Sequence, residues 1–234
     1  MAVFENEIKS IIKRLQRLSK KKRTVYVSVT GNHKKYDINS ENNGWFEGND
    51  PSVTFSNLGL QDDPGRIRWP SIRYPIYRRI INYSVSFLCT LLPASKIKNT
   101  LYRSIGFRIG RNVEICLSAF LDPFCPKLIK IGEGTLLGSF ARVFSHAYIG
   151  NGDVIVGEVK TGQNCRLLID CVVGPICLDD GVVIMPKTMT MPYFKVIKKN
   201  SVVGFLLPHL KEKISSGKID YNKVENLEKE HGKT

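Results

Sequence analysis

The sequence has few of the residues from which metal and redox sites are built. Its six cysteines include no Cys-x-x-Cys pair, and its four histidines are His33, His146, His209 and His231. A carbonic anhydrase needs three histidines around its zinc ion, and only His146 lies in the repeated part of the chain described below. The sequence therefore excludes that class of enzyme and predicts no metal site.

Long apolar segments are also absent. Ile80–Leu92 is the most apolar segment, and its thirteen residues are too few to cross a bilayer, which takes about twenty. The N-terminus is charged and shows no signal peptide. We therefore expect a cytoplasmic protein in which cysteines stay reduced. Four of the cysteines occupy equivalent positions of a repeat, which favours buried structural thiols over a disulfide framework or redox chemistry.

A six-residue repeat organises the chain from residue 131 to 178. Its words begin almost always with a branched aliphatic residue, and these first letters are Ile131, Leu137, Val143, Ile149, Ile155, Thr161, Leu167, Val173 and Leu178. The fifth letter is usually small or slim. A helix repeats every 3.6 residues and a strand every two, so a period of six indicates neither alone. It is typical of a three-sided solenoid in which three words close each turn.

The frame extends backwards to Ile109 and forwards to Ile184, with one insertion from 127 to 130. Four motifs stand in and after it: Leu121–Pro123, Ile131–Gly134, Ser145–Tyr148 and Asn200–Gly204. In their order and spacing they resemble the hexapeptide-repeat acyltransferases, in the branch that includes the maltose, galactoside and capsule-sugar O-acetyltransferases. The resemblance implies an all-β core, a left-handed parallel β-helix.

The expected domain organisation follows from this repeat. Residues 109–208 should form the β-helix domain, preceded by a basic helical and irregular region, 1–108, and followed by a helical tail, 209–234. Between His146 and Val159 the chain should form either one more coil or a loop that covers the active site of a neighbouring subunit.

The resemblance implies a chemistry centred on His146. In such transferases a histidine at the end of a repeat word is the general base that takes the proton of an acceptor hydroxyl during attack on acetyl-coenzyme A. Imidazole near its unperturbed pKa accepts a proton at cytosolic pH. Asp122 lies on the corresponding face one coil earlier and is expected to orient the acceptor or the imidazole. The alternatives are a surface or core histidine and a turn aspartate.

The same resemblance implies that acetyl-coenzyme A, as co-substrate, lies along the later coils between two subunits of a homotrimer. Contacts are expected from Gln163 and Pro186, and phosphate contacts from Lys187, Lys198 and Lys199, for which solvated surface lysines are the alternative. The chain departs from the family at residues 184–192. Methionines stand there in place of the usual glycine- and alanine-rich words.

The net charge of +14 belongs to the region before the repeat. Residues 1–24 carry eight basic and two acidic side chains, and residues 65–111 carry ten basic and no acidic ones. Residues 1–23 have the spacing of an amphipathic helix, which packs on the protein or docks on a membrane. Ile80–Leu92 is expected to form an interfacial or a buried helix whose basic ends favour anionic lipid.

Other parts of this region allow simpler predictions. Residues 96–105 should form a helix that caps the open end of the coils. Residues 24–29 have the alternation of a strand, and residues 31–51 are expected to form a loop. Aromatic residues alternate with the basic ones, but no RNA- or DNA-binding motif accompanies them, so we do not expect nucleic acid as a partner.

These features predict an O-acetyltransferase that uses acetyl-coenzyme A and acts on a sugar or a lipid-linked sugar precursor of the cell surface. We expect it in the cytoplasm and peripherally at the inner membrane surface. Two alternatives stay open. One is a non-catalytic β-helix that binds membranes or an acidic partner, and the other is an N-acetyltransferase of a nucleotide-linked amino sugar, which would share the same machinery.

Overall fold

The computed structural model describes residues 2–18, 26–29, 35–37, 52–56, 74–150, 153–190 and 196–204. The expected C-terminal helical tail, 209–234, lies outside the described residues, as do His33, His209 and His231. No helix of the described part is long and apolar enough to span a membrane.

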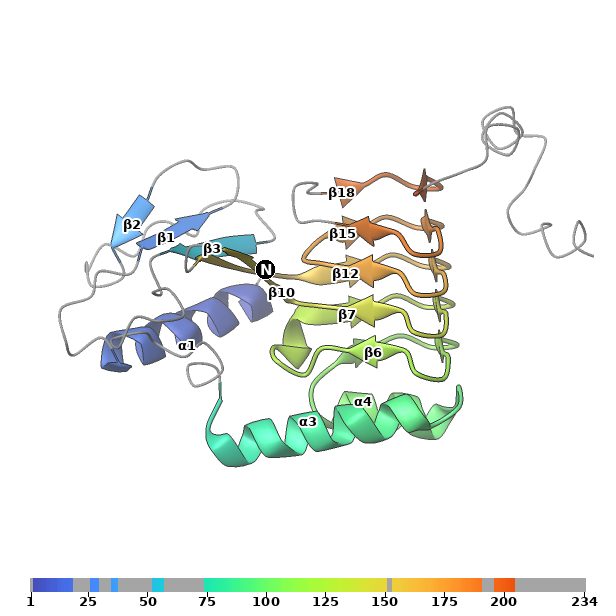
Figure 1. The fold of residues 1–234 in the computed structure, drawn as a ribbon, viewed down its shortest axis with the longest axis horizontal. Coiled ribbons are helices and arrows are strands. Elements are labelled where there is room, and N and C mark those ends of the chain that lie inside the picture. The colour runs from blue at the N-terminus through green and yellow to red at the C-terminus, as the bar shows by residue number, and fades with distance from the viewer. Residues whose placement is uncertain are drawn as a thin grey trace, which may run out of the picture. The chain divides into compact units, whose positions relative to one another are not determined.

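Short parallel strands make up the core of the chain and form three sheets (Figure 1). The first sheet contains β4 (Arg108–Ile109), β7 (Ile129–Ile131), β12 (Val159–Thr161), β15 (Cys177–Leu178) and β18 (Val196–Ile197). The second contains β5 (Glu114–Ile115), β8 (Leu136–Leu137), β13 (Arg166–Leu167), β16 (Val183–Ile184) and β19 (Val202–Val203). The third contains β6 (Phe120–Leu121), β9 (Arg142–Val143), β14 (Val172–Val173) and β17 (Met189–Thr190). Successive strands fall in successive sheets, so three strands make one coil, and the predicted left-handed parallel β-helix is confirmed.

The first letters of the repeat words form the core of the coils. Those that are fully buried are Ile115, Leu121, Leu137, Val143, Leu167, Val173 and Ile184. Thr161, the one polar first letter, is buried too, and its hydroxyl accepts a hydrogen bond from the Gly132 N–H at 2.8 Å. Fifth letters such as Thr135, Ala141, Cys165 and Cys171 are fully buried. The repeat therefore packs as its period predicts, with one aliphatic and one slim side chain inside each flat side.

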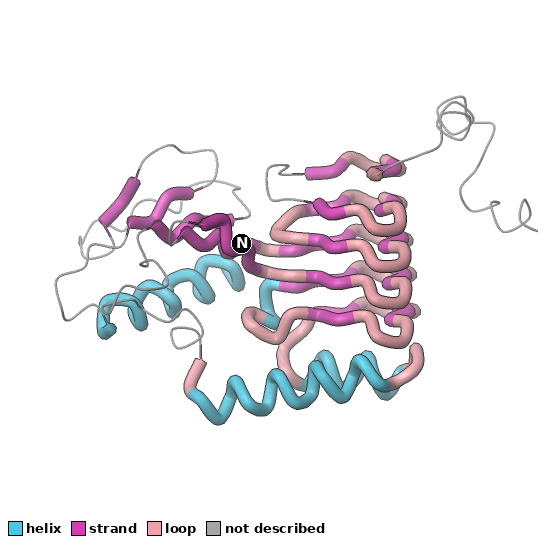
Figure 2. Tube along the Cα trace, in the orientation of Figure 1, coloured by secondary structure: helices cyan, strands magenta, loops and turns pink. Residues whose placement is uncertain are grey.

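The words that begin at Ile149 and Ile155 do not form a coil. Instead β10 (His146–Gly150) and β11 (Asp153–Gly157) form an antiparallel hairpin. β11 pairs with β3 (Ser52–Ser56), β3 pairs with β1 (Tyr26–Val29), and β1 pairs with β2 (Lys35–Asp37), so the hairpin completes a five-stranded antiparallel sheet outside the coils (Figure 2).

The hairpin corrects two predictions. Of the two alternatives left open between His146 and Val159, the extra coil is wrong, because the chain leaves the coils there. The two residues between the strands are Asn151-Gly152, and this dipeptide between alternating apolar residues is a strong hairpin signal. Residues 35–37, expected in a loop, form a strand, whereas the strand expected at 24–29 is confirmed.

The N-terminal helix α1 (Ala2–Leu18) confirms the predicted amphipathic helix. Ile8 and Ile11 are fully buried and Ile12 nearly so, and the helix contacts the short 3-10 helix η2 (Pro126–Leu128). Glu7 of α1 forms an ion pair with Lys127 at 3.5 Å. The described middle of the apolar face of α1 is therefore packed on the protein, as in the first of its two interpretations.

Two further helices, α3 (Ile76–Leu91) and α4 (Lys96–Ser104), close the end of the coils that begins with β4. The carbonyl groups of a first coil have no strand before them and need other partners. Side chains of α3 and α4 supply those partners: Asn82, Ser86, Lys98, Asn99, Tyr102 and Arg103 all donate to carbonyl oxygens of residues 109–123. The predicted cap at 96–105 is confirmed.

Candidate active site

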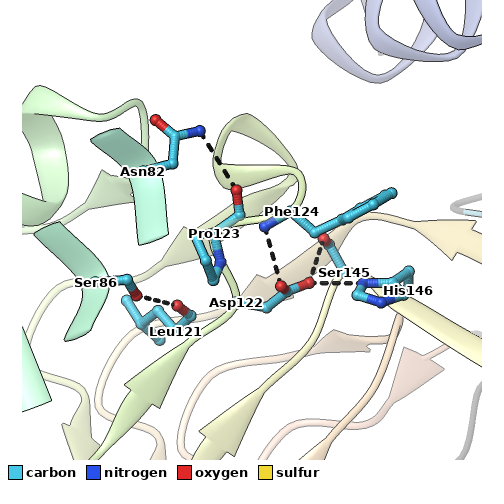
Figure 3. A network of polar contacts seen from close by, with 8 residues as sticks. All are labelled: Asn82, Ser86, Leu121, Asp122, Pro123, Phe124, Ser145 and His146. Carbon is cyan, nitrogen blue, oxygen red and sulfur yellow. Dashed lines mark hydrogen bonds and ion pairs between the residues drawn. The ribbon is translucent and has the colours of Figure 1, made fainter. Parts of the chain in front are cut away.

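Asp122 lies where the third sheet ends and the first coil turns towards the second. It follows β6 directly and is only 3% exposed. Its Oδ1 accepts the Phe124 N–H at 3.0 Å, as in an Asx turn. Its Oδ2 accepts the Ser145 hydroxyl at 3.2 Å and lies 2.7 Å from Nδ1 of His146 (Figure 3). Oδ1 therefore binds the backbone of the turn, and Oδ2 binds the side chains of Ser145 and His146.

His146 reaches this carboxylate from the next coil. β6 and β9 are neighbours in the third sheet, with Leu121 opposite Val143. His146 comes three residues after Val143, as the first residue of β10, and pairs with Val156 of β11. The pairing of β6 with β9 thus places His146 beside Asp122, and the pairing of β10 with β11 fixes the backbone at His146.

Two aromatic rings hold the imidazole in place. The centroid of the Phe124 ring lies 4.4 Å from that of His146, and the Phe144 ring stands edge-on at 6.4 Å. The His146 side chain keeps a quarter of its surface exposed, whereas that of Asp122 keeps 4%. A buried carboxylate is thus bound to one edge of a ring whose other edge can meet a substrate.

The contact determines which ring nitrogen is available for chemistry. An ionised carboxylate only accepts hydrogen bonds, so Nδ1 of a neutral imidazole facing Asp122 carries the proton. The other nitrogen, Nε2, then has the free electron pair and can accept a proton from a third group. The two predicted catalytic residues therefore lie together, in the arrangement of a general base and its orienting carboxylate.

Three residues of this site were not predicted. Ser86 of α3 donates to the Leu121 carbonyl at 2.7 Å, and Asn82, one turn earlier, donates to the Pro123 carbonyl at 3.4 Å (Figure 3). Both side chains are buried, so α3 holds the backbone on either side of Asp122. Ser145 is the third. A signal for the first two existed, because polar residues four apart interrupt an otherwise apolar segment on one helical face.

Tyr83 of α3 lies within the electrostatic reach of this site. Its pKa is raised above the ordinary value, first because burial disfavours the phenolate and then because of the negative charge of Asp122. The side chain is nevertheless 46% exposed. Tyr83 is therefore a partly exposed side chain whose ionisation the Asp122 carboxylate disfavours.

The predicted coenzyme A residues are divided between two other corners of the coils. Gln163, Lys198 and Lys199 lie in connections between strands of the first sheet and strands of the second. Pro186 and Lys187 lie in a turn between the second and third sheets. All five are exposed. The structure does not bring these two groups together within one chain, nor either of them to His146, which follows the third sheet.

Among the side chains that the structure describes, no group of three or more His, Cys, Asp or Glu residues is placed to hold a metal ion.

No protein-family model matches the chain, and no curated protein matches it. Several solved structures are similar in fold. A maltose O-acetyltransferase from Clostridium difficile 630 shares 17% identity over 54% of this chain and 81% of that chain, with a TM-score of 0.42. A hexapeptide-repeat acetyltransferase from Vibrio cholerae O1 biovar eltor, complexed with acetyl-coenzyme A, shares 12% over 55% and 82%, with a TM-score of 0.45. A galactoside acetyltransferase in complex with coenzyme A shares 13% over 61% and 79%, with a TM-score of 0.41.

All three are acetyltransferases, the class that the sequence motifs resemble. Identities this low say nothing of which residues perform a reaction.

Proposed function

We propose that the protein is an acyltransferase that moves the acetyl group of acetyl-coenzyme A to a hydroxyl of a sugar or of a sugar-containing cell-surface precursor. The observation that carries this proposal is the 2.7 Å contact between Nδ1 of His146 and the buried Asp122 carboxylate. It supports a histidine whose Nε2 is ready to take a proton, at a position that the β10–β11 hairpin and two aromatic rings hold steady.

The chain's own groups account for the proton transfers of such a reaction. Bound acetyl-coenzyme A supplies an activated thioester carbon. Nε2 of His146 takes the proton of the acceptor hydroxyl as its oxygen forms a bond to that carbon, and the negative charge of Asp122 stabilises the resulting imidazolium. When the carbon–sulfur bond breaks, the same proton passes to the leaving thiolate. The histidine returns to its starting state, and no covalent enzyme intermediate is needed.

The placement of the predicted coenzyme A residues supports a homotrimer. Gln163 and Lys199 lie on one corner of the coils, Lys187 on a second and His146 on the third. In a closed threefold assembly, corners of different copies face one another. We propose that His146 of one copy works with exposed lysines of its neighbour, which offer positive charge to the phosphates of coenzyme A. The protein would act in the cytoplasm.

His146→Ala tests the proposed base. Loss of a general base typically lowers turnover about 10²- to 10⁴-fold, so acetyl transfer, measured as release of free coenzyme A thiol, should fall by that amount. Thermal stabilisation by coenzyme A should remain, because His146 is not among its proposed contacts. Arg142→Ala is the control. Arg142 lies on the same coil as His146, and its substitution removes an exposed ion pair to Asp170 of the next coil, so turnover should stay unchanged.

The same measurements separate the alternatives. A protein that coenzyme A does not stabilise is a binding module rather than a transferase. Unchanged turnover in His146→Ala would exclude the proposed mechanism. Acetylation of an amino sugar in preference to the matching hydroxyl sugar would identify N-transfer by the same machinery.

A further inference from the structure

Helix α3 exposes its large apolar residues and buries the polar Asn82 and Ser86 against the protein. The side chains that it buries most completely are Asn82, Ser86 and Cys89. The large apolar side chains on its opposite face are between 45% and 66% exposed: Ile76, Tyr77, Ile80, Ile81, Tyr83, Phe87, Leu88 and Leu91. We call this set the outer face of α3. In a helix that simply packs on a core, the two faces would be exchanged.

The inner face is polar because it caps the first coil. The carbonyl groups of Leu121 and Pro123 need donors, which Ser86 and Asn82 provide. Capping therefore accounts for every polar residue that α3 buries. It does not account for the eight large exposed apolar side chains on the outer face. An exposed apolar patch of this kind is a feature of sites that bind a partner or a membrane.

The charges around the outer face favour an anionic lipid surface. Arg78 and Arg79 of α3 itself are partly exposed, Lys96 at the start of the neighbouring α4 is exposed, and the sequence from 66 to 111 contains no acidic residue. A second copy of this chain docking face to face would bring two basic regions together, and like charges repel. Anionic head groups would instead be attracted.

The shape and composition of α3 suit the surface of a bilayer rather than its interior. Its sixteen residues extend about 24 Å along the helix axis, with the apolar stripe along the whole length. Tyr77 and Tyr83 combine an apolar ring with a polar hydroxyl, the residue type that collects at the membrane–water boundary. A helix of this kind lies in the plane of the head groups.

We propose that the outer face of α3 docks the protein on anionic membranes and places the Asp122–His146 pair at the level of the lipid head groups. The same helix would bind the membrane on one face, and on the other it binds the backbone on both sides of Asp122. If the proposed acetyl transfer holds, on which this last point rests, the acceptor hydroxyl belongs to a lipid-anchored molecule.

Sedimentation with vesicles tests the docking. The full chain should pellet with phosphatidylcholine vesicles that contain about 30 mol% phosphatidylglycerol and stay in the supernatant with phosphatidylcholine alone. The bound fraction should fall as salt rises from about 50 to about 500 mM. The triple variant Ile80→Ser, Phe87→Ser, Leu91→Ser should reduce binding at least about fivefold, and its melting temperature should hold because these side chains are exposed.

A matched triple variant serves as the control. Leu117→Ser, Ile169→Ser and Met189→Ser remove apolar side chains of similar exposure from the coils and should pellet like the parent. Equal binding by the outer-face variant and the parent would overturn the proposal, as would a parent that ignores anionic vesicles at low salt. If the parent does not bind anionic vesicles and the outer-face variant has a lower oligomeric state than the parent by light scattering, the outer face joins copies of this chain instead.

His146→Ala separates this proposal from the proposed function. That variant should pellet like the parent, because His146 is not on the outer face. Vesicle binding by a protein without acetyl transfer activity would reject the enzyme and leave the docking surface in place. Acetyl transfer without vesicle binding would do the opposite.

Discussion

The buried cysteines show how strongly the coils confine single residues. Burial raises the pKa of the Cys89 thiol from its ordinary value of 9.0 to about 11 and that of Cys171 to about 12. Burial also raises the pKa values of Cys165 and Cys177. The thiol protons thus stay in the folded protein at pH values where an unfolded chain has lost them, which links folding to pH.

We expect the free energy of unfolding to fall as pH rises above about 9. Between pH 9 and 11 the unfolded chain binds fewer protons than the folded one, and each such thiol removes up to about 1.4 kcal/mol per pH unit. Lys98 acts in the opposite sense, because burial lowers its pKa, but it is one group against four. Melting temperatures at pH 8, 9 and 10 under reducing conditions measure the effect. The double variant Cys165→Ala, Cys171→Ala should have a flatter dependence, and a melting temperature that rises over this range would contradict the prediction.

The β10–β11 hairpin is the element that joins the proposed catalytic pair, Asp122 and His146, to the N-terminal region. His146 begins β10, and β11 pairs with β3 along Val154–Gly157. β3 is a central strand, with β11 on one side and β1 on the other. β3, about ninety residues before His146 in sequence, thus pairs with the hairpin that carries His146. The backbone around Asp122 is held instead by α3 and by the pairing of β6 with β9.

Thr54→Pro should therefore lower activity without melting the coils. Thr54 is paired with Ile155 and with Ser28 in the middle of β3, where proline cannot donate to the ladder. A displaced hairpin shifts His146, and a misplacement of about 1 Å can cost about 10²-fold in turnover. Turnover and thermal unfolding measured side by side test this, with Thr54→Ser as the control. Normal turnover in the proline variant would show that the antiparallel sheet does not position the histidine.

At the scale of the whole molecule, the three corners of the coils carry three different sets of residues. The proposed catalytic pair follows the third sheet, the predicted coenzyme A residues Gln163 and Lys199 follow the first, and Lys187 follows the second. The corners of a flat-sided column point away from one another, so a single chain cannot close one site from all of them. A trimer can, because each copy offers its neighbour a different corner.

Mixing two inactive variants tests the shared site. His146→Ala chains and Lys187→Glu chains, unfolded together and refolded at equal amounts, should regain about one quarter of the activity of the parent, because one pairing in four joins an intact histidine to an intact lysine. Refolded separately, each variant should stay inactive. A mixture with no more activity than its parts would place both residues in the same chain's site, and light scattering that gives a monomer would exclude the trimer itself.

Sequence by itself determined the coils and the candidate base. The inside of a coil depends only on local period, because a side chain points inwards or outwards according to its place in a six-residue word, and the buried first letters from Ile109 to Ile184 follow this rule. His146 was predicted as the base because its place at the end of a repeat word resembles that of the histidine in the hexapeptide-repeat acyltransferases, and Asp122 was predicted from its place on the corresponding face one coil earlier.

Only the tertiary structure decided what meets across long distances in the chain. The pairing of β11 with β3 depends on a partner strand whose own pattern is short, so the words at Ile149 and Ile155 matched the coil period while the chain formed a hairpin. The direction of α3 depended on unpaired carbonyl groups at the end of the coils, which require donors and therefore draw Asn82 and Ser86 inwards. The sequence left open whether Ile80–Leu92 forms an interfacial or a buried helix. In the structure the large apolar side chains of α3 are exposed, because its polar side chains cap the backbone of the first coil.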